Sequence, residues 1–199
     1  MKEIYLAGGC FWGMEGYFSQ IDGILDTSVG YANGQVETTN YQLLKQTDHA
    51  ETLYLAYDET RINLREILLY YFRVIDPLSV NQQGPDKGRQ YRTGIYYTDE
   101  VDLPTIEQVM TEQSQLFGGR PLAVEVEPLA HYIPAEDYHQ DYLKKNPQGY
   151  CHIDLGQAKI PLIDVADYPK PDQQVLKDSL TDLQYQVTQE AATERPFEN

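Results

Sequence analysis

Short strand-like segments alternate with helical segments through most of the chain, and this alternation constrains the fold more than any other feature. The strands are expected at residues 3–7, 24–31, 52–58, 91–98 and 122–129, and the helices at residues 11–20, 41–46, 64–75, 103–116 and 135–145. Several strands alternate apolar with polar side chains, which is typical of a sheet that helices cover on one face. We therefore predict an α+β fold in two layers, with a mixed or antiparallel sheet covered by helices.

The helix expected at residues 64–75 has the most complete sequence signals. Asn63 is a favourable N-cap residue, and Glu66 stands three positions later, where it can complete a capping box. The apolar residues fall on one face: Leu64, Ile67, Leu68, Tyr71, Phe72 and Ile75. Pro77 ends the helix, and residues 78–88 are expected to form a long polar loop of the kind that often carries function.

The charge balance excludes some classes of partner. The 199 residues include 15 Lys and Arg against 31 Asp and Glu, a formal net charge of −16, and such a field repels nucleic-acid phosphates and anionic membrane surfaces. No apolar run is long enough for a signal peptide or a membrane span, so we expect a cytoplasmic protein. In that reducing compartment, the presence of only two cysteines, Cys10 and Cys151, argues against a framework of structural disulfides. The two thiols could still be reactive.

The composition changes toward the C-terminus. Pro161, Pro169 and Pro171 interrupt an acidic stretch, after which apolar residues are scattered and aromatic residues are few. We therefore assign residues 1–160 to one folded domain and residues 161–199 to a linker and an irregular tail.

Cys10 is the leading candidate for a reactive group. It lies at the junction between an expected strand and an expected helix, where backbone N–H groups and the positive end of the helix can lower the pKa of a thiol. Phe11 and Trp12 follow directly and can form the wall of an apolar pocket beside the sulfur. Taken alone, the cysteine could equally be a small buried hydrophobic residue.

Cys10 lies in the first of a series of short motifs that extends along most of the chain. They are residues 8–15 (GGCFWGME), 30–34 (GYANG), 40–41 (NY), 48–51 (DHAE), 76–77 (DP), 83–92 (QGPDKGRQYR), 138–143 (YHQDYL) and 146–151 (NPQGYC). In order and spacing these motifs resemble the A-type peptide methionine sulfoxide reductases, over about residues 4–155. The resemblance implies a ferredoxin-like plait and reduction of the S epimer of methionine sulfoxide, free or in proteins, since each epimer has its own enzyme.

Sulfoxide reduction makes definite demands on a site. The sulfur becomes a good electrophile only when its oxygen is protonated or strongly hydrogen-bonded, so the site needs a thiolate, an acid, hydroxyl donors and an apolar pocket. The resemblance implies that Cys10 attacks the sulfur and becomes a sulfenic acid, while Glu51 protonates the oxygen. The pKa of Glu51 must then be raised, which burial against aromatic rings would achieve.

Further roles are implied by the same resemblance. Tyr41 and Tyr91 would hold the sulfoxide oxygen through their hydroxyl groups. Phe11 and Trp12 would surround the methyl group, and Asp86 would anchor the site through hydrogen bonds or water. Without the motifs each residue has an ordinary explanation, because a tyrosine usually packs and a charged residue is usually solvated.

Cys151 is expected to be the resolving cysteine. It follows Asn146, Pro147 and Gly149, in a turn-rich segment that can swing toward a distant thiol. The resemblance implies that Cys151 attacks the Cys10 sulfenic acid, expels water and forms a disulfide, which thioredoxin or another external dithiol reduces. No bound cofactor is expected.

Three alternatives remain open from the sequence. A zinc site could be assembled from His131, His139, Cys151 and His152, although their spacing lacks the paired short loops of structural zinc. A Cys-His hydrolase would use Cys10 and His49 and would not need Cys151. An acidic, non-enzymatic interaction module would bind partners through the tail and would be indifferent to Cys10→Ser.

The sequence departs from the commonest family pattern at several positions. Residues 46–48 replace a usual Thr-Gly, Ile75 stands where histidine is common, and Pro85 stands where asparagine is usual. Pro85 and Lys87 are expected to change the loop around Asp86, and with it the substrate preference.

The end of the chain has a second resemblance. Residues 176–197 are similar to the opening of a B-type methionine sulfoxide reductase domain, which indicates a piece or a remnant of a fused A–B protein. The segment stops before the sheet of that domain and contains no further cysteine, so we expect no activity on the R epimer. An alternative is an amphipathic helix that covers the domain edge.

Overall fold

The computed structural model describes residues 1–164, 167 and 171–190, and it divides into two compact units, Met1–Leu162 and Ile163–Asn199. The part of the tail motif at residues 193–197 lies outside the described residues. No helix among the residues described is long and apolar enough to cross a membrane.

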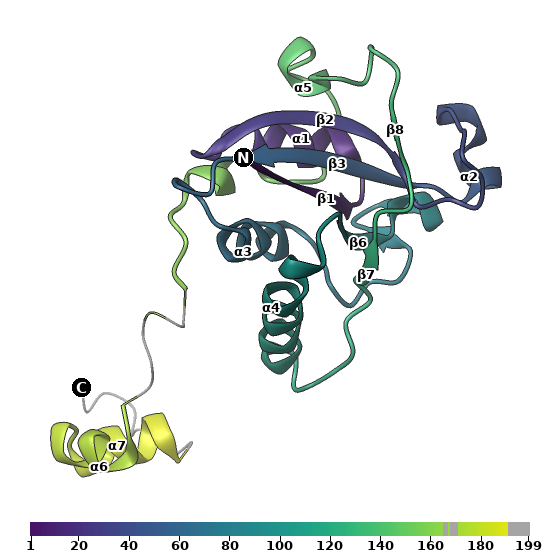
Figure 1. The fold of residues 1–199 in the computed structure, drawn as a ribbon. Helices are drawn as coiled ribbons and strands as arrows, with labels where there is room; N and C mark the ends of the chain where they lie inside the picture. Colours follow the sequence, from purple (N-terminus) through teal and green to yellow (C-terminus); the bar gives the residue numbers. More distant parts are fainter. Residues whose placement is uncertain (165–166, 168–170, 191–199) are drawn as a thin grey trace. The chain divides into compact units, whose positions relative to one another are not determined.

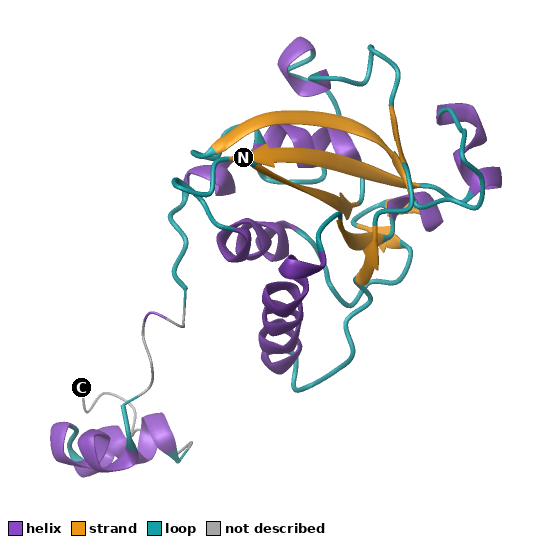
Figure 2. Ribbon diagram, in the orientation of Figure 1, coloured by secondary structure: helices purple, strands orange, loops and turns teal. Residues whose placement is uncertain are grey.

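A curled six-stranded sheet forms the centre of the first unit (Figures 1 and 2). Its strands are β1 (Lys2–Gly8), β2 (Ile24–Ala32), β3 (Ala50–Tyr57), β6 (Thr93–Tyr97), β7 (Glu125–Pro128) and β8 (Tyr132–Pro134), in the order β7-β6-β1-β3-β2-β8. Neighbouring strands are antiparallel except β6 and β7, which are parallel. The prediction of an α+β fold around a mixed sheet is confirmed.

Helices and short turns join these strands. They are α1 (Phe11–Phe18), η1 (Tyr41–Leu43), α2 (Leu44–Thr47), α3 (Leu64–Val74), η2 (Arg89–Tyr91), η3 (Glu100–Asp102), α4 (Leu103–Leu116), α5 (Tyr142–Lys145) and η4 (Leu155–Lys159), where η denotes a 3₁₀ turn. The loop expected at residues 78–88 contains a small hairpin of β4 (Gln82–Gln83) and β5 (Asp86–Lys87). Helix α3 begins with the capping box expected from Asn63 and Glu66.

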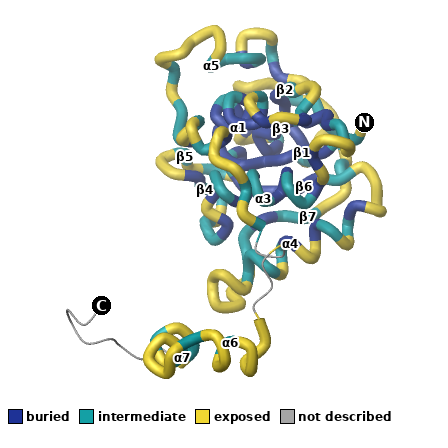
Figure 3. The backbone as a smooth tube through the Cα atoms, turned by 90° about the vertical axis from the view of Figure 1, so that its left-hand side faces the viewer, coloured by how far each residue is buried: buried dark blue, intermediate teal, exposed yellow. Residues whose placement is uncertain are grey.

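The main core lies between one face of the sheet and helices α1, α3 and α4. It includes Leu6 and Leu53 from the strands, Met14 from α1 and Ile67 from α3, all almost completely buried. Figure 3 shows much of α1, β1 and β3 in the colour of buried residues. Tyr71 on α3 ties this layer to the sheet, because its hydroxyl donates to the Ala7 carbonyl at 2.7 Å and accepts from the Gly94 amide at 3.1 Å. The opposite face carries a smaller cluster of mainly tyrosine and alanine side chains.

The expectation of a helix at residues 135–145 is wrong. The segment follows directly after β8, passes through turns and becomes helical only in α5. The Gln140 side chain accepts from the Val29 amide at 2.9 Å and donates to the Val29 carbonyl at 2.8 Å, so it pairs with the edge of β2. Asp141 has a left-handed backbone, and its amide donates to the buried Glu15 carboxyl at 2.7 Å. These contacts between distant segments override the local helical pattern.

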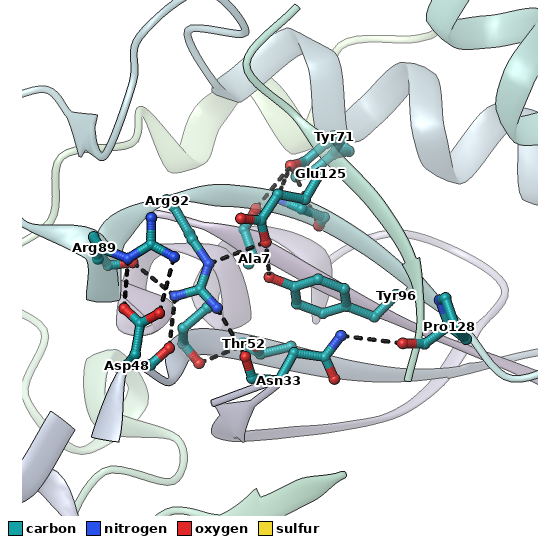
Figure 4. Close-up of polar contacts among 12 residues, drawn as sticks. Ala7, Asn33, Asp48, Thr52, Tyr71, Arg89, Arg92, Tyr96, Glu125 and Pro128 are labelled. Atoms are coloured by element: carbon teal, nitrogen blue, oxygen red, sulfur yellow. Dashed lines mark hydrogen bonds and ion pairs between the residues drawn. The ribbon is translucent and has the colours of Figure 1, made fainter. Parts of the chain in front are cut away.

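A buried arginine joins the loops at one end of the sheet (Figure 4). Arg92 is 4 % exposed, and its guanidinium donates to the Glu125 carboxyl and to the carbonyls of Asn33, Asp48 and Arg89, each at 3.0 Å. Arginine suits this position because its planar group presents five donors in fixed directions. The ends of β2, α2 and η2 are therefore held together.

The second unit contains two short helices, α6 (Gln173–Ser179) and α7 (Asp182–Gln189). The side chains of Asp172 and Thr181 cap their first turns. The expectation of an irregular tail is therefore wrong for this part, because both helices have their own capping residues.

Candidate active site

The structure brings most of the expected site residues together around one cavity. The cavity measures about 260 Å³ and is lined by Cys10, Phe11, Trp12, Tyr41, Glu51, Asp86, Tyr91 and Tyr150. They come from α1 and its N-cap, from η1, β3, β5 and η2, and from the segment before Cys151. Of the eight catalytic and substrate-binding residues expected from the sequence, only Cys151 is absent from this lining. Tyr150 was not anticipated, although its position inside the NPQGYC motif was the signal that could have identified it.

Cys10 is the N-cap residue of α1 and is 6 % exposed. Burial raises the pKa of its thiol, and the nearby Glu51 carboxylate raises it further, while the backbone amides of Trp12 and Gly13 oppose the rise. The expectation that the helix start lowers this pKa is therefore wrong for the site without substrate. Two amides do stabilise the thiolate as anticipated, but removal of water from the sulfur outweighs them.

Glu51 lies on β3 and is 2 % exposed. Burial raises its pKa to about 8, and the Phe11 amide limits the rise by donating to the carboxyl at 3.1 Å. The direction agrees with the sequence-based expectation. At neutral pH the carboxyl is therefore mainly protonated, and it faces the start of the helix that carries Cys10.

Tyr41 and Tyr91 line the same cavity as Cys10. Burial raises the pKa of both hydroxyl groups, and the Glu51 carboxylate adds to this rise, so both remain protonated donors. Asn40 positions Tyr41 by capping the η1 turn, and the Tyr41 amide donates to the Glu136 carboxyl at 3.1 Å.

Aromatic contacts fix the wall beside the cysteine. The Trp12 indole N–H donates to His139 Nδ1 at 3.0 Å, and its ring stacks on Tyr142 with centroids 3.7 Å apart and planes inclined by 12°. Phe11 packs against Tyr31, with ring centroids 5.8 Å apart. Because each ring packs against other aromatic rings, the wall is preorganised.

Asp86 connects the cavity with the segment around Cys151. The Tyr150 hydroxyl donates to the Asp86 carboxyl at 2.8 Å, and His152 Nδ1 lies 3.9 Å from the same carboxyl oxygen. Cys151 therefore stands between two residues that both contact Asp86. Its own thiol donates to the Ile153 carbonyl at 3.1 Å, and both cysteines are free.

The sulfur of Cys151 packs against the first turn of α1. A Cβ atom added to Gly13 would lie only 3.2 Å from that sulfur, so the absence of a side chain lets the Cys151 segment approach the helix. Both cysteines thus lie at the start of α1: Cys10 is its N-cap and lines the cavity, whereas Cys151 lies beside Gly13 and is not part of the lining.

The geometry does not favour the hydrolase or the zinc alternative. His49 contacts Thr47 through Nδ1 at 3.0 Å and His131 through Nε2 at 2.9 Å, so both ring nitrogens are engaged away from Cys10. His139 lies among aromatic rings beside Trp12 instead of joining His131. No group of three or more His, Cys, Asp or Glu residues in the described part of the chain is arranged to hold a metal ion.

The sequence of this chain matches a known protein family. The family profile for peptide methionine sulfoxide reductase matches residues 2–167. The chain belongs to this family. It is therefore an oxidoreductase that reduces methionine sulfoxide by thiol chemistry, and the motif-based resemblance is confirmed.

Solved structures of known proteins are similar to this chain in sequence and fold. The reduced form of Mxr1 from Saccharomyces cerevisiae is 41 % identical, with a TM-score of 0.72 over 75 % of this chain and 88 % of that chain. Methionine sulfoxide reductase A of Corynebacterium diphtheriae is 34 % identical, with a TM-score of 0.69 over 76 % of this chain and 77 % of that chain. Mxr1 in complex with Trx2 is 29 % identical, with a TM-score of 0.51 over 71 % of this chain and 84 % of that chain.

Proposed function

We propose that this chain reduces the S epimer of methionine sulfoxide through a Cys10 sulfenic acid and a Cys10–Cys151 disulfide. The observation that carries the proposal is the shared cavity, which places a thiol, a protonated carboxyl and two tyrosine hydroxyls around one small space. These are the groups that transfer of oxygen from a sulfoxide to a thiol requires.

In the first step the Cys10 sulfur attacks the sulfoxide sulfur while Glu51 donates its proton to the oxygen. Tyr41 and Tyr91 donate hydrogen bonds to that oxygen, and the rings of Phe11 and Trp12 receive the methyl group. The thiol proton passes to the Glu51 carboxylate, so the acid is restored. Oxygen moves from the substrate to Cys10, which leaves methionine and a sulfenic acid.

In the second step the Cys151 sulfur attacks the Cys10 sulfenic acid, and the hydroxyl group leaves with a proton as water. The contacts of Tyr150 and His152 with Asp86 keep the Cys151 segment beside the cavity until this step. An external dithiol then reduces the disulfide by thiol exchange. Thioredoxin is the proposed dithiol, supported by the complex of Saccharomyces cerevisiae Mxr1 with Trx2.

A single-turnover assay with the separated epimers tests this route without any external reductant. We expect about one methionine per chain from the S epimer only, with loss of both thiols. Cys10→Ser should give no product, whereas Cys151→Ser should give methionine and retain a sulfenic acid that a dimedone probe labels. Turnover of both epimers, or methionine formation by Cys10→Ser, would contradict the proposal.

The finer organisation of the chain is also part of the proposal. The alternation of β1, α1, β2, β3, α3 and β6, with the strand order β6-β1-β3-β2, supports a ferredoxin-like plait at the centre of the sheet. Residues 1–160 are the proposed reductase domain and residues 161–199 a linker and tail. The resemblance of the tail to a B-type domain and the cytoplasmic location stay predictions from the sequence.

A further inference from the structure

A second and larger cavity adjoins the one that contains Cys10. It measures about 610 Å³ and shares Tyr41, Glu51, Asp86 and Tyr91 with the smaller cavity, so the two spaces have a common wall. Its lining also includes Lys45 and Lys87. Lys45 belongs to α2, which Figure 1 labels, and Lys87 to β5, which Figure 3 labels. A substrate that places a sulfoxide beside Cys10 can therefore extend into the larger cavity that these lysines line.

These two lysines are unusual in this chain. The net charge is −16, with twice as many acidic as basic residues, and the neighbouring cations are engaged with acids: Arg89 with Asp48 and Arg92 with Glu125. Both lysines are exposed, and within the described part of the chain neither ammonium group has a salt bridge or a hydrogen bond. Two uncompensated cations therefore stand together on the wall of a cavity in an otherwise acidic molecule.

The acids in the same cavity do not neutralise them. Burial raises the pKa of Glu51 to about 8, so this carboxyl is mainly protonated at neutral pH. The Asp86 carboxyl accepts from the hydroxyl of Tyr150, which is not part of the lining of the larger cavity. Two lysine charges thus face the open space against one carboxylate, which favours an anionic group on the ligand.

We propose that Lys45 and Lys87 form a carboxylate-binding subsite that selects methionine sulfoxide substrates carrying a nearby negative charge. The subsite rests on the proposed function, because it assumes that the sulfoxide binds beside Cys10. The carboxylate can belong to an Asp or Glu residue next to the oxidised methionine in a peptide, or to the α-carboxylate of methionine sulfoxide itself. Lysine suits both, because its ammonium group is a flexible point charge with three donors.

Binding to the 199-residue chain with Cys10→Ser tests the subsite without turnover. The single tryptophan, Trp12, lines the Cys10 cavity, so its fluorescence reports occupancy. The first pair of ligands is the blocked tripeptide with S-methionine sulfoxide between two Glu residues and its counterpart with two Gln residues. The second pair is N-acetyl methionine sulfoxide with a free carboxylate and its methylamide.

We expect the charged member of at least one pair to bind more tightly, by up to about fivefold for each solvent-exposed lysine. The double variant Lys45→Gln/Lys87→Gln should bring this ratio close to one. The control Lys159→Gln/Lys177→Gln removes the same charge from residues outside both cavities and should preserve the ratio. High salt should reduce the ratio in the chain with both lysines, because exposed charges are screened.

The two pairs separate the possible sources of the carboxylate. A lysine-dependent ratio for the tripeptides identifies a flanking acidic residue, and one for the N-acetyl pair identifies the α-carboxylate. A ratio near one for both pairs, or a ratio that the double variant leaves unchanged, would overturn the subsite. Absence of methionine formation from the neutral tripeptide by the unmutated chain would instead refute the proposed function, while the binding ratios still decide the subsite.

Discussion

Replacing the buried acid of the site should make the protein more stable and less active. Glu51 holds its proton up to about pH 8 in the folded chain, whereas an unfolded chain releases it near the ordinary value of 4.5. Between these values the folded state binds more protons than the unfolded state, so stability falls as the pH rises. Glu51→Gln keeps the shape of the side chain and an acceptor for the Phe11 amide but has no proton to lose.

The size of the effect follows from the pKa shift. Each pH unit between the unfolded and the folded pKa costs about 1.4 kcal/mol of unfolding free energy. From pH 4.5 to pH 7 the destabilisation by Glu51 therefore reaches about 3 kcal/mol, and it stops growing above about pH 8. We expect Glu51→Gln to match the unmutated chain near pH 4.5 and to exceed its stability by about this amount at pH 7.

Urea denaturation of both chains at several pH values between 5 and 8 measures the difference, in which the titration of all other groups cancels. Glu37→Gln, a change at an exposed loop glutamate, is the matched control and should show no such growth of stability with pH. In the single-turnover assay Glu51→Gln should lower the rate of methionine formation by about 10²–10⁴-fold, the usual contribution of a general acid. A stability difference that stays constant with pH would refute the argument from burial.

Three further predictions concern the surroundings of the site. Gly13→Ala should slow loss of the second thiol several-fold but leave the first methionine unaffected, because the new Cβ would lie 3.2 Å from the Cys151 sulfur; equal effects on both steps would contradict this. Arg92→Ala should lower the unfolding free energy by about 3–5 kcal/mol in urea denaturation, since it removes the four hydrogen bonds of a buried guanidinium to the Glu125 carboxyl and to three carbonyls, and a loss below 1 kcal/mol would show that water replaces the guanidinium. Tyr71→Phe should cost about 1–3 kcal/mol in the same measurement, because the Ala7 carbonyl and the Gly94 amide lose a buried partner; an unchanged midpoint would refute it.

Those parts of the fold that depend on local signals could be predicted from the sequence. Helix α3 has its N-cap, its capping box and an amphipathic face within twelve successive residues, and the structure contains all three. The error at residues 135–145 has the opposite cause. Gln140 and Asp141 are held by Val29 and Glu15, which lie more than a hundred positions away in the chain, and no local pattern encodes such contacts.

The same division applies to the candidate site. Seven residues of the cavity lining lie within the motifs that carried the family resemblance, and Tyr150 lies in one of them without having been singled out. Lys87 lies in one of these motifs and was expected to change the loop around Asp86, whereas Lys45 lies in none of them. That both lysines line one cavity depends on the approach of α2 to β5, which the sequence does not encode locally. The direction of the Cys10 pKa shift could not be predicted either, because the sequence indicates the helix start but not how deeply the thiol is buried.

The raised pKa of Cys10 becomes intelligible when Glu51 is considered with it. A carboxylate at Glu51 raises the thiol pKa, and burial keeps Glu51 protonated at neutral pH, so neither Cys10 nor Glu51 carries a charge in the resting site. In such a site the thiolate need not exist before the substrate binds. A sulfoxide oxygen that accepts the Glu51 proton leaves a carboxylate that can accept the proton of Cys10, so the nucleophile forms only as the electrophile is activated. Burial alone would make the Cys10 thiol unreactive. It is compatible with this reaction because Glu51 gives one proton to the sulfoxide oxygen and takes another from Cys10.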